Sequence, residues 1–91
     1  MNLKKLADAA NVALARISAF AAKNGSTAPL ESIRNQMKFI RDAAVDGKNP
    51  NSQLAPGQLF TYAILASREF ASPEELEVKA ALDAVSALLD G

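Results

Sequence analysis

Acidic residues in the last third of the chain could, by their type and spacing, perform general acid–base chemistry. Glu69 is followed closely by Glu74 and Glu75, and two neighbouring carboxyl groups can serve as acid and base without a histidine. No nucleophile and no cofactor-binding loop accompanies these acids, and carboxylates near the start of a helix are favoured there electrostatically and normally face water. We therefore expect that the protein has no catalytic residues and is not an enzyme.

The residue types that carry most metal and nucleophile chemistry are absent, because the sequence contains neither His nor Cys. This removes imidazole and thiolate metal sites, disulfides, and the Ser–His and Cys–His nucleophile pairs. A phosphate-binding loop is also unsupported, since Gly47 and Gly57 lie ten residues apart without the Lys-Ser/Thr ending that such a loop requires. We expect no cofactor and no metal. The lack of Cys fits a reducing compartment.

Basic residues form the second candidate site: Arg34, Lys38 and Arg41 recur at helical spacing. We expect the row, which is short, to lack interleaved exposed aromatics, and it belongs to a chain of zero net charge, so we do not expect nucleic-acid binding. The two halves of the chain differ, however. Residues 1–48 hold eight bases and four acids, and residues 49–91 hold two bases and six acids, giving +4 and −4. This asymmetry fits either mutual attraction of the halves or a polar docking face for a partner.

Apolar residues at spacings of three and four define the elements that position these charges. With 91 residues, the chain suits one domain, 1–91, that buries roughly 60–65% of its surface. A composition rich in Ala and poor in aromatics favours closely packed helices. We predict an all-α fold, a small four-helix bundle with helices over 2–23, 29–46, 56–70 and 73–89. The stripe Ile33, Met37, Ile40 and Ala44 marks the second as the central helix.

Local signals set the boundaries of these helices. Gly25 and Gly47 end the first two, Ser26 and Thr27 offer caps before Pro29, and the connection after Gly47 includes a short helical turn near Leu54. A capping box over residues 72–75 starts the last helix. The helix over 56–70 is apolar nearly all round. We expect it to be buried rather than to present an apolar patch, with the hydroxyl of Tyr62 at a wet edge.

The beginning of the chain imitates a secretion signal, with lysines first and a small-residue segment later. Asp8, Asn11 and Arg16 interrupt the apolar core that a signal needs, and the same residues fit an amphipathic helix. No stretch is long and apolar enough to span a membrane. We therefore expect a cytoplasmic protein without a membrane role.

Two segments, read together, resemble a known family. The segment 36–40 reads Gln-Met-Lys-Phe-Ile and is followed by Asp46, and an apolar helix over 60–70 ends in Arg-Glu-Phe. The last helix then begins Pro-Glu-Glu-Leu at 73–76. In these features the chain resembles the small all-helical immunity proteins that neutralise NAD(P)+-hydrolysing toxins delivered by the type VI secretion system. The resemblance extends over roughly residues 30–85.

The resemblance implies a protein that binds a cognate toxin domain one-to-one and occludes its active site in the cytosol. The charged residues that we expect to contact the partner, each of which could equally be merely solvated, are Arg34, Lys38, Arg41, Glu69, Glu74 and Glu77. Gln36, Asp46 and Glu69 could instead owe their place in the motif to hydrogen bonds at helix ends. The alternative function is a helical adaptor or a self-associating interaction module with no toxin partner, because an Ala-rich stripe serves a dimer seam as well as a monomer core.

Overall fold

A computed structural model describes residues 1–90 of the chain, and within this range it contains helices and no strand. The elements are α1 (Leu3–Asn24), α2 (Ala28–Val45), the short 3₁₀ helix η1 (Pro50–Gln53), α3 (Tyr62–Glu69) and α4 (Pro73–Asp90). The predicted all-α four-helix fold is confirmed. The predicted limits of α1, α2 and α4 agree with the structure to within one residue, and the short helical turn predicted near Leu54 is η1.

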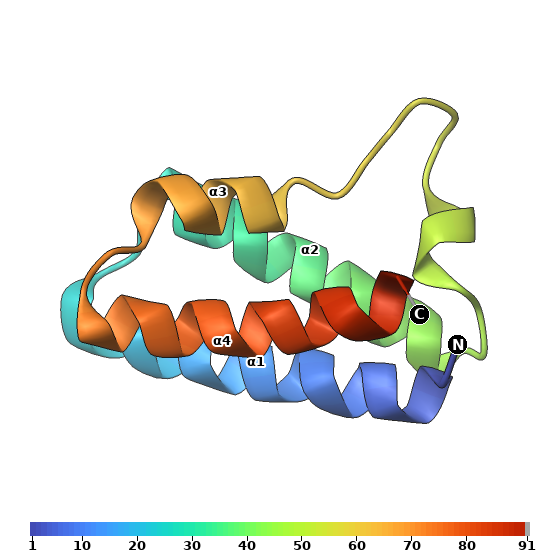
Figure 1. The fold of residues 1–91 in the computed structure, drawn as a ribbon, viewed down its shortest axis with the longest axis horizontal. Helices are drawn as coiled ribbons and strands as arrows, with labels where there is room; N and C mark the ends of the chain where they lie inside the picture. Colours follow the sequence, from blue (N-terminus) through green and yellow to red (C-terminus); the bar gives the residue numbers. More distant parts are fainter. Residues whose placement is uncertain (91) are drawn as a thin grey trace.

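The three long helices form the body of the molecule, and short α3 lies above their left-hand part in Figure 1. α1 packs against both α2 and α4, whereas α2 has α1 as its one long partner and meets α3 and η1 over short stretches. The helix predicted to be central is therefore one wall of the bundle, and α1 joins the two other long helices.

The core follows the apolar spacing of the sequence. The side chains of Ile33, Met37 and Ile40 on α2 are completely buried, and Leu82 and Val85 of α4 are buried with them. From α1, small residues alternate with large ones, so the helices approach closely; its buried residues are Leu6, Ala7, Ala10, Ala13, Leu14 and Ile17. The stripe predicted for the second helix, Ile33, Met37, Ile40 and Ala44, thus lies in the core.

Side chains that cap the helices lie where the sequence predicts them. Thr27 Oγ1 accepts a hydrogen bond of 3.3 Å from Leu30 N at the start of α2, and Gly25 ends α1 with a positive φ of 85°. At the start of α4, Glu75 N donates to Ser72 Oγ over 3.2 Å, and Ser72 N donates to Glu75 Oε1 over 3.0 Å. The predicted capping box is confirmed.

The start of the third helix was wrongly predicted, because α3 begins at Tyr62 and not at residue 56. Gly57 adopts a positive φ of 81°, and Gln58 N donates to Ala55 O over 2.9 Å, so residues 55–58 form a turn. The predicted burial of this segment is partly correct, since Tyr62, Ala66 and Phe70 are buried, and partly wrong. Leu59 is 83% exposed and Ile64 is 55% exposed.

Tyr62 corrects another expectation, since its ring is 3% exposed rather than at a wet edge. Its hydroxyl lies 2.8 Å from Ser86 Oγ, a hydrogen-bonding distance. Burial is the main cause that raises the pKa of Tyr62 above 10.0. This residue therefore ties α3 to α4 through the interior of the bundle.

Candidate interaction surface

The side chain of Gln36, on α2, holds the beginning of α3. Gln36 Oε1 accepts hydrogen bonds from Thr61 N over 2.8 Å and from Tyr62 N over 2.9 Å. Its Nε2 donates to Thr61 Oγ1 over 3.0 Å and to Ser32 Oγ over 3.3 Å. The N-cap residue Thr61 makes no side-chain cap hydrogen bond of its own. Gln36 therefore supplies the missing cap of α3 from another helix.

Gln36 thus confirms that a residue of the family motif can owe its place to hydrogen bonds at a helix end. Asp46 and Glu69 differ, since neither side chain makes a hydrogen bond within residues 1–90 and both are exposed. Asp46 ends α2 through its backbone N–H, which donates to Asp42 O over 3.1 Å. The carboxylates of Asp46 and Glu69 remain free for other contacts.

A groove lies between α2 and the connection that leads to α3, which arches beyond the helices in Figure 1. Its volume is about 680 Å³, and it is lined by Ala28, Glu31, Ser32, Asn35, Gln36, Phe39, Leu54, Gln58, Leu59, Phe60 and Thr61. The Phe39 and Phe60 rings meet edge to face with their centroids 5.9 Å apart. Apolar side chains, this aromatic pair among them, thus share the wall of the groove with polar ones.

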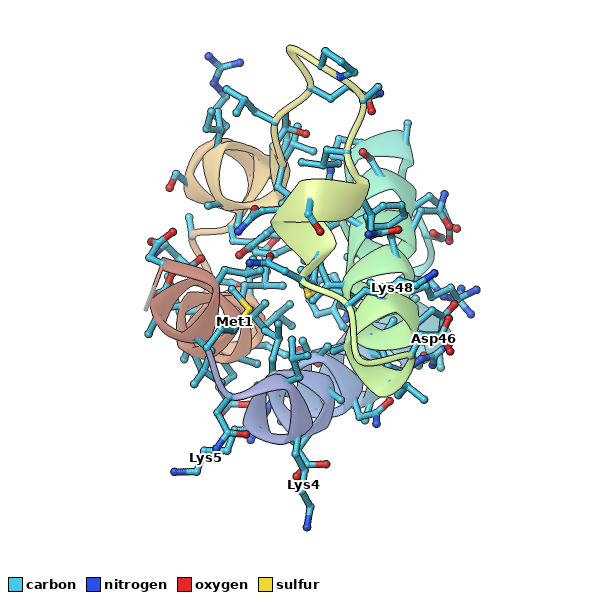
Figure 2. All side chains as sticks on the ribbon, turned by 90° about the vertical axis from the view of Figure 1, so that its right-hand side faces the viewer. Met1, Lys4, Lys5, Asp46 and Lys48 are labelled. Atoms are coloured by element: carbon cyan, nitrogen blue, oxygen red, sulfur yellow. The ribbon has the colours of Figure 1, made fainter. Side chains whose placement is uncertain are left out.

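Phe39 stands between this groove and a second, smaller hollow at the end of α2. The second hollow is lined by Phe39, Asp42, Ala43, Asp46, Lys48 and Gln53. Figure 2 shows Asp46 and Lys48 close together on this side of the molecule, away from Lys4 and Lys5 on α1. The two hollows share Phe39, which is 40% exposed.

The sequence did not predict these hollows. Leu59 was assigned to a buried helical face, whereas it projects from the loop. The signal that could have revealed it is the dipeptide Pro56-Gly57, which marks a turn rather than a helix interior. The other half of the surface depends on Gln36 reaching across to Thr61, and no local pattern encodes that contact.

The predicted basic row lies on α2 as expected, but its members differ in their surroundings. Arg34 Nη1 lies 3.6 Å from Glu31 Oε1, and Arg41 Nε lies 3.0 Å from Asp42 Oδ1. Lys38 is exposed and forms no ion pair within residues 1–90. The Nε of Arg34 is buried and has no hydrogen-bond partner among the described residues. Lys38 is therefore the base of this row most available to a partner.

The predicted acids lie around the junction of α3 and α4, apart from the basic row. Glu69 ends α3, Glu74 Oε2 lies 3.5 Å from Lys23 Nζ, and Glu77 is exposed. Glu74 and Glu77 line a shallow hollow between α1 and α4 together with Arg16. No ion pair or hydrogen bond within residues 1–90 joins these acids to the three bases. Three of the six charged residues therefore lie on α2, and the other three lie on α3 and α4.

Few of the opposite charges in the two halves of the chain form ion pairs with each other. Among residues 1–90, the ion pairs are Glu31–Arg34, Arg41–Asp42, Lys79–Asp83 and Lys23–Glu74, and the last alone joins the halves. All four pairs lie at the surface, with side chains that are 32–72% exposed, and such pairs contribute about 0–1 kcal/mol each. Mutual attraction of the halves is thus a small effect in this fold, and the charge remains at the surface.

Glu75, one of the carboxylates considered for catalysis, takes part in the capping box of α4. Hydrogen bonds from the backbone and the hydroxyl of Ser72 and from Ala71 N lower the pKa of Glu75. A lowered pKa keeps this carboxyl ionised at neutral pH, which is the opposite of what a general acid needs. Within residues 1–90 there is also no group of three acidic side chains placed to bind a metal ion. None of the helices described over this range combines the length and hydropathy needed to cross a bilayer.

The described part of the chain is a helical bundle that carries a groove lined by apolar and polar side chains, together with exposed charged side chains. The Tsi6 family model matches residues 5–90 of the chain. The protein therefore belongs to the Tsi6 family, a family of type VI secretion immunity proteins, as the resemblance in the sequence indicates. Neither the curated proteins nor the solved structures gave a match.

Proposed function

We propose that this protein binds the catalytic domain of a cognate type VI toxin that hydrolyses NAD(P)+, as a one-to-one complex, and covers the active site of that toxin. The observation that carries the proposal is the family match over residues 5–90, which makes a toxin the expected partner. The resemblance of the segments 36–40 and 60–70 to immunity proteins against NAD(P)+-hydrolysing toxins supports the choice of substrate.

Occlusion of an active site requires a stiff surface that does not rearrange on binding, because ordering a flexible surface costs affinity. Two features support this requirement. The side chains of Ile33, Met37 and Ile40 fix α2 from the inside, and Gln36 fixes the start of α3 against α2. Neither feature needs a cofactor, and the chemistry of the toxin is stopped by exclusion of its substrate.

The six charged residues named from the sequence are proposed as contacts at the rim of the complex. Lys38, Glu69 and Glu77 have no internal ion pair within residues 1–90, and the pairs of the other three lie at the surface. Breaking an ion pair at the surface costs little free energy, so its members can pair with a partner instead. Charges at the rim of an interface act mainly on the rate of association. Because the bases lie on α2 and the acids lie on α3 and α4, charge reversal of one group at a time would show which of them faces the toxin.

The place of action follows from the proposed substrate. A toxin that consumes NAD(P)+ acts on a pool of dinucleotide in the cytosol, so protection must be present there. We therefore propose that the protein acts in the cytoplasm of the cell that produces both toxin and immunity protein, and of its sister cells.

The experiment that tests this function measures NAD+ hydrolysis by the toxin domain encoded next to the gene of this protein. The toxin domain is held constant while the protein is added from zero to two equivalents. We expect hydrolysis to fall linearly and to stop at one equivalent. Inhibition of a different nucleotide-consuming toxin would correct the substrate and keep the immunity role. Neither inhibition nor binding would overturn the proposal and leave the adaptor or self-associating module.

A further inference from the structure

We propose that the peptide bond between Leu59 and Phe60 is a proteolytic cleavage site of the folded protein. The enzyme is an endopeptidase that holds a large apolar side chain in a hydrophobic slot before the bond that it cuts. Water supplies both new ends: the C–N bond breaks, Leu59 gains a carboxylate, and the nitrogen of Phe60 leaves as an amine that takes up the proton. The inference does not depend on toxin binding, because it concerns this chain alone.

The side chain of Leu59 is accessible to such a slot, since it is 83% exposed. Within residues 1–90, the large apolar side chains that are exposed are Met1, Val12, Phe39, Val45, Leu59, Ile64 and Leu76. Five of these seven lie in helices, and Met1 begins the chain. A hydrophobic slot accepts an apolar side chain that can enter it without unfolding of a helix. Leu59 is therefore the one exposed large apolar residue of a connection between the described helices.

The main chain at Leu59 and Phe60 is also free. An endopeptidase binds its substrate as an extended segment through main-chain hydrogen bonds, as a peptide does when it adds a strand to a sheet edge. Neither the N–H nor the C=O group of Leu59 or Phe60 makes a hydrogen bond within residues 1–90. Inside a helix these groups are paired, and the helix must open before an enzyme can bind it. Exposed loops are accordingly the preferred sites of cleavage.

The two aromatic residues that follow Leu59 are held by packing. The centroid of the Phe60 ring lies 5.9 Å from that of Phe39 and 6.3 Å from that of Tyr62. Tyr62 is 3% exposed, and its hydroxyl lies 2.8 Å from Ser86 Oγ. A cut after either aromatic residue requires its ring to leave these contacts first. A cut after Leu59 requires no such step, so Leu59 determines which bond is cut.

Hydrogen bonds on both sides of the bond set the rate of cleavage. Before it, Gln58 N donates to Ala55 O and Ala55 N donates to Gln58 Oε1, each over 2.9 Å. After it, Thr61 N donates to Gln36 Oε1 over 2.8 Å. The binding site of an endopeptidase extends over several residues, so these hydrogen bonds open when the enzyme binds. Where opening is fast, the rate of cleavage follows the population of the open form, and loss of the Gln36 contact should speed the cut.

The two pieces of the chain, residues 1–59 and 60–91, should stay together after the cut. α4 packs against α1, and Leu82 and Val85 of α4 are buried in the core. The second piece also keeps the contact between Tyr62 and Ser86, since both residues belong to it. We expect a nicked protein that elutes from a gel-filtration column with the intact protein and separates into two pieces in denaturant.

The experiment treats the full chain with chymotrypsin, whose hydrophobic slot accepts leucine and aromatic side chains. Mass spectrometry of samples taken early identifies the first cut. We expect fragments 1–59 and 60–91 to appear first, ahead of any cut after an aromatic residue. A first cut after Phe60 or Tyr62, within a helix, or at several bonds at once would overturn the proposed site. Resistance of the folded protein, under conditions that cut it in urea, would overturn it as well.

Substitutions at two exposed leucines test the role of the Leu59 side chain. Leu59→Asp brings a charge to the hydrophobic slot and should slow the cut at this bond at least about tenfold. Leu76→Asp, on α4 where Leu76 is 47% exposed, is the matched control and should change the rate less than about twofold. Leu59→Phe should be cut at least as fast as the wild type. All three variants should melt with the wild type, since both leucines are outside the core. An unchanged rate for Leu59→Asp would overturn the role of Leu59.

Gln36→Ala tests the hydrogen bonds that flank the cleaved bond. It should speed the cut after Leu59 by about threefold or more, whereas Asn35→Ala should leave the rate unchanged. Acceleration confined to this bond distinguishes local opening from unfolding of the whole chain, which would also expose Phe70. Equal rates for the two variants would overturn the control of cleavage by Gln36. The test contains no toxin, so the proposed function is judged separately from this inference.

Discussion

Replacement of Gln36 by Ala tests the contact that holds the candidate surface together. The substitution removes the acceptor of Thr61 N and Tyr62 N and the donor to Thr61 Oγ1. Thr61 is exposed, so water can replace its partner, but Tyr62 is 3% exposed and its N–H becomes a donor without a partner. Loss of a helix cap costs about 0.5–2 kcal/mol, and a buried unpaired donor costs about 1–3 kcal/mol.

These overlapping contributions give an expected loss of about 1.5–3 kcal/mol in the free energy of unfolding. Urea denaturation followed by circular dichroism measures it. With a urea dependence near 1.5 kcal/mol per molar for a small protein, the midpoint should fall by about 1–2 M. Hydrogen exchange should show faster exchange of the amides of α3, because this short helix loses its cap, while the amides of α1 keep most of their protection.

Two further variants make the prediction specific to the cap. Gln36→Glu keeps an acceptor at the start of α3, where negative charge is favourable, and should lose less than about 1 kcal/mol. Asn35→Ala changes the neighbouring residue, which is exposed and makes no hydrogen bond within residues 1–90, and should leave the midpoint nearly unchanged. A Gln36→Ala midpoint equal to that of Asn35→Ala would refute the reasoning.

Four other predictions concern the capping box, the core and the rim. Ser72→Ala should lower the melting temperature by several degrees, because it removes the hydroxyl that accepts from Glu75 N. The pKa of Glu75 is lowered in the folded state, so this carboxylate stabilises the fold above the ordinary pKa of 4.5, and the stabilisation is lost as the pH falls through the lowered pKa. The difference in stability between wild type and Glu75→Gln should therefore vanish in acid. A difference that stays constant with pH would contradict this. The pKa of Tyr62 is raised in the folded state, so its phenol stabilises the fold fully below pH 10.0, and the stabilisation is lost as the pH rises through the raised pKa. Absorbance titration of this single tyrosine should give a midpoint above 10.0. Tyr62→Phe should lower the free energy of unfolding, measured in urea, by about 0.5–1.5 kcal/mol. Lys38→Glu should slow association with the toxin several-fold at low salt and much less at high salt; an effect independent of salt would remove Lys38 from the rim.

The parts of the fold that the sequence predicts are those set by local information. Apolar spacing and caps fix α1, α2 and α4, because burial of one face and satisfaction of the end groups depend on residues three or four positions apart. The start of α3 is not set by such local signals. Residues 59 and 60 are apolar enough for a helix, but the turn at Gly57 and the cap supplied by Gln36, 25 residues earlier, place the boundary at Tyr62.

The candidate surface likewise has features that local sequence predicts and features that depend on distant contacts. Exposure of the charged residues of α2 and α4 follows from their position opposite the apolar stripes, so the sequence predicts it. Burial of Tyr62 and exposure of Leu59 depend on contacts with Ser86 and on the course of the loop. These contacts join residues far apart in the chain, and a periodic pattern carries no information about them.

The central claim, that the protein covers the dinucleotide site of a toxin, is tested most directly by competition. Association of the protein with the toxin domain is timed by stopped-flow fluorescence, with and without a saturating non-hydrolysable NAD+ analogue. If the protein covers the active site, the occupied toxin must release the analogue first, and the association rate should fall nearly to zero as the analogue saturates. An association rate that is unchanged at saturation would contradict the claim, since the two ligands would then occupy separate surfaces.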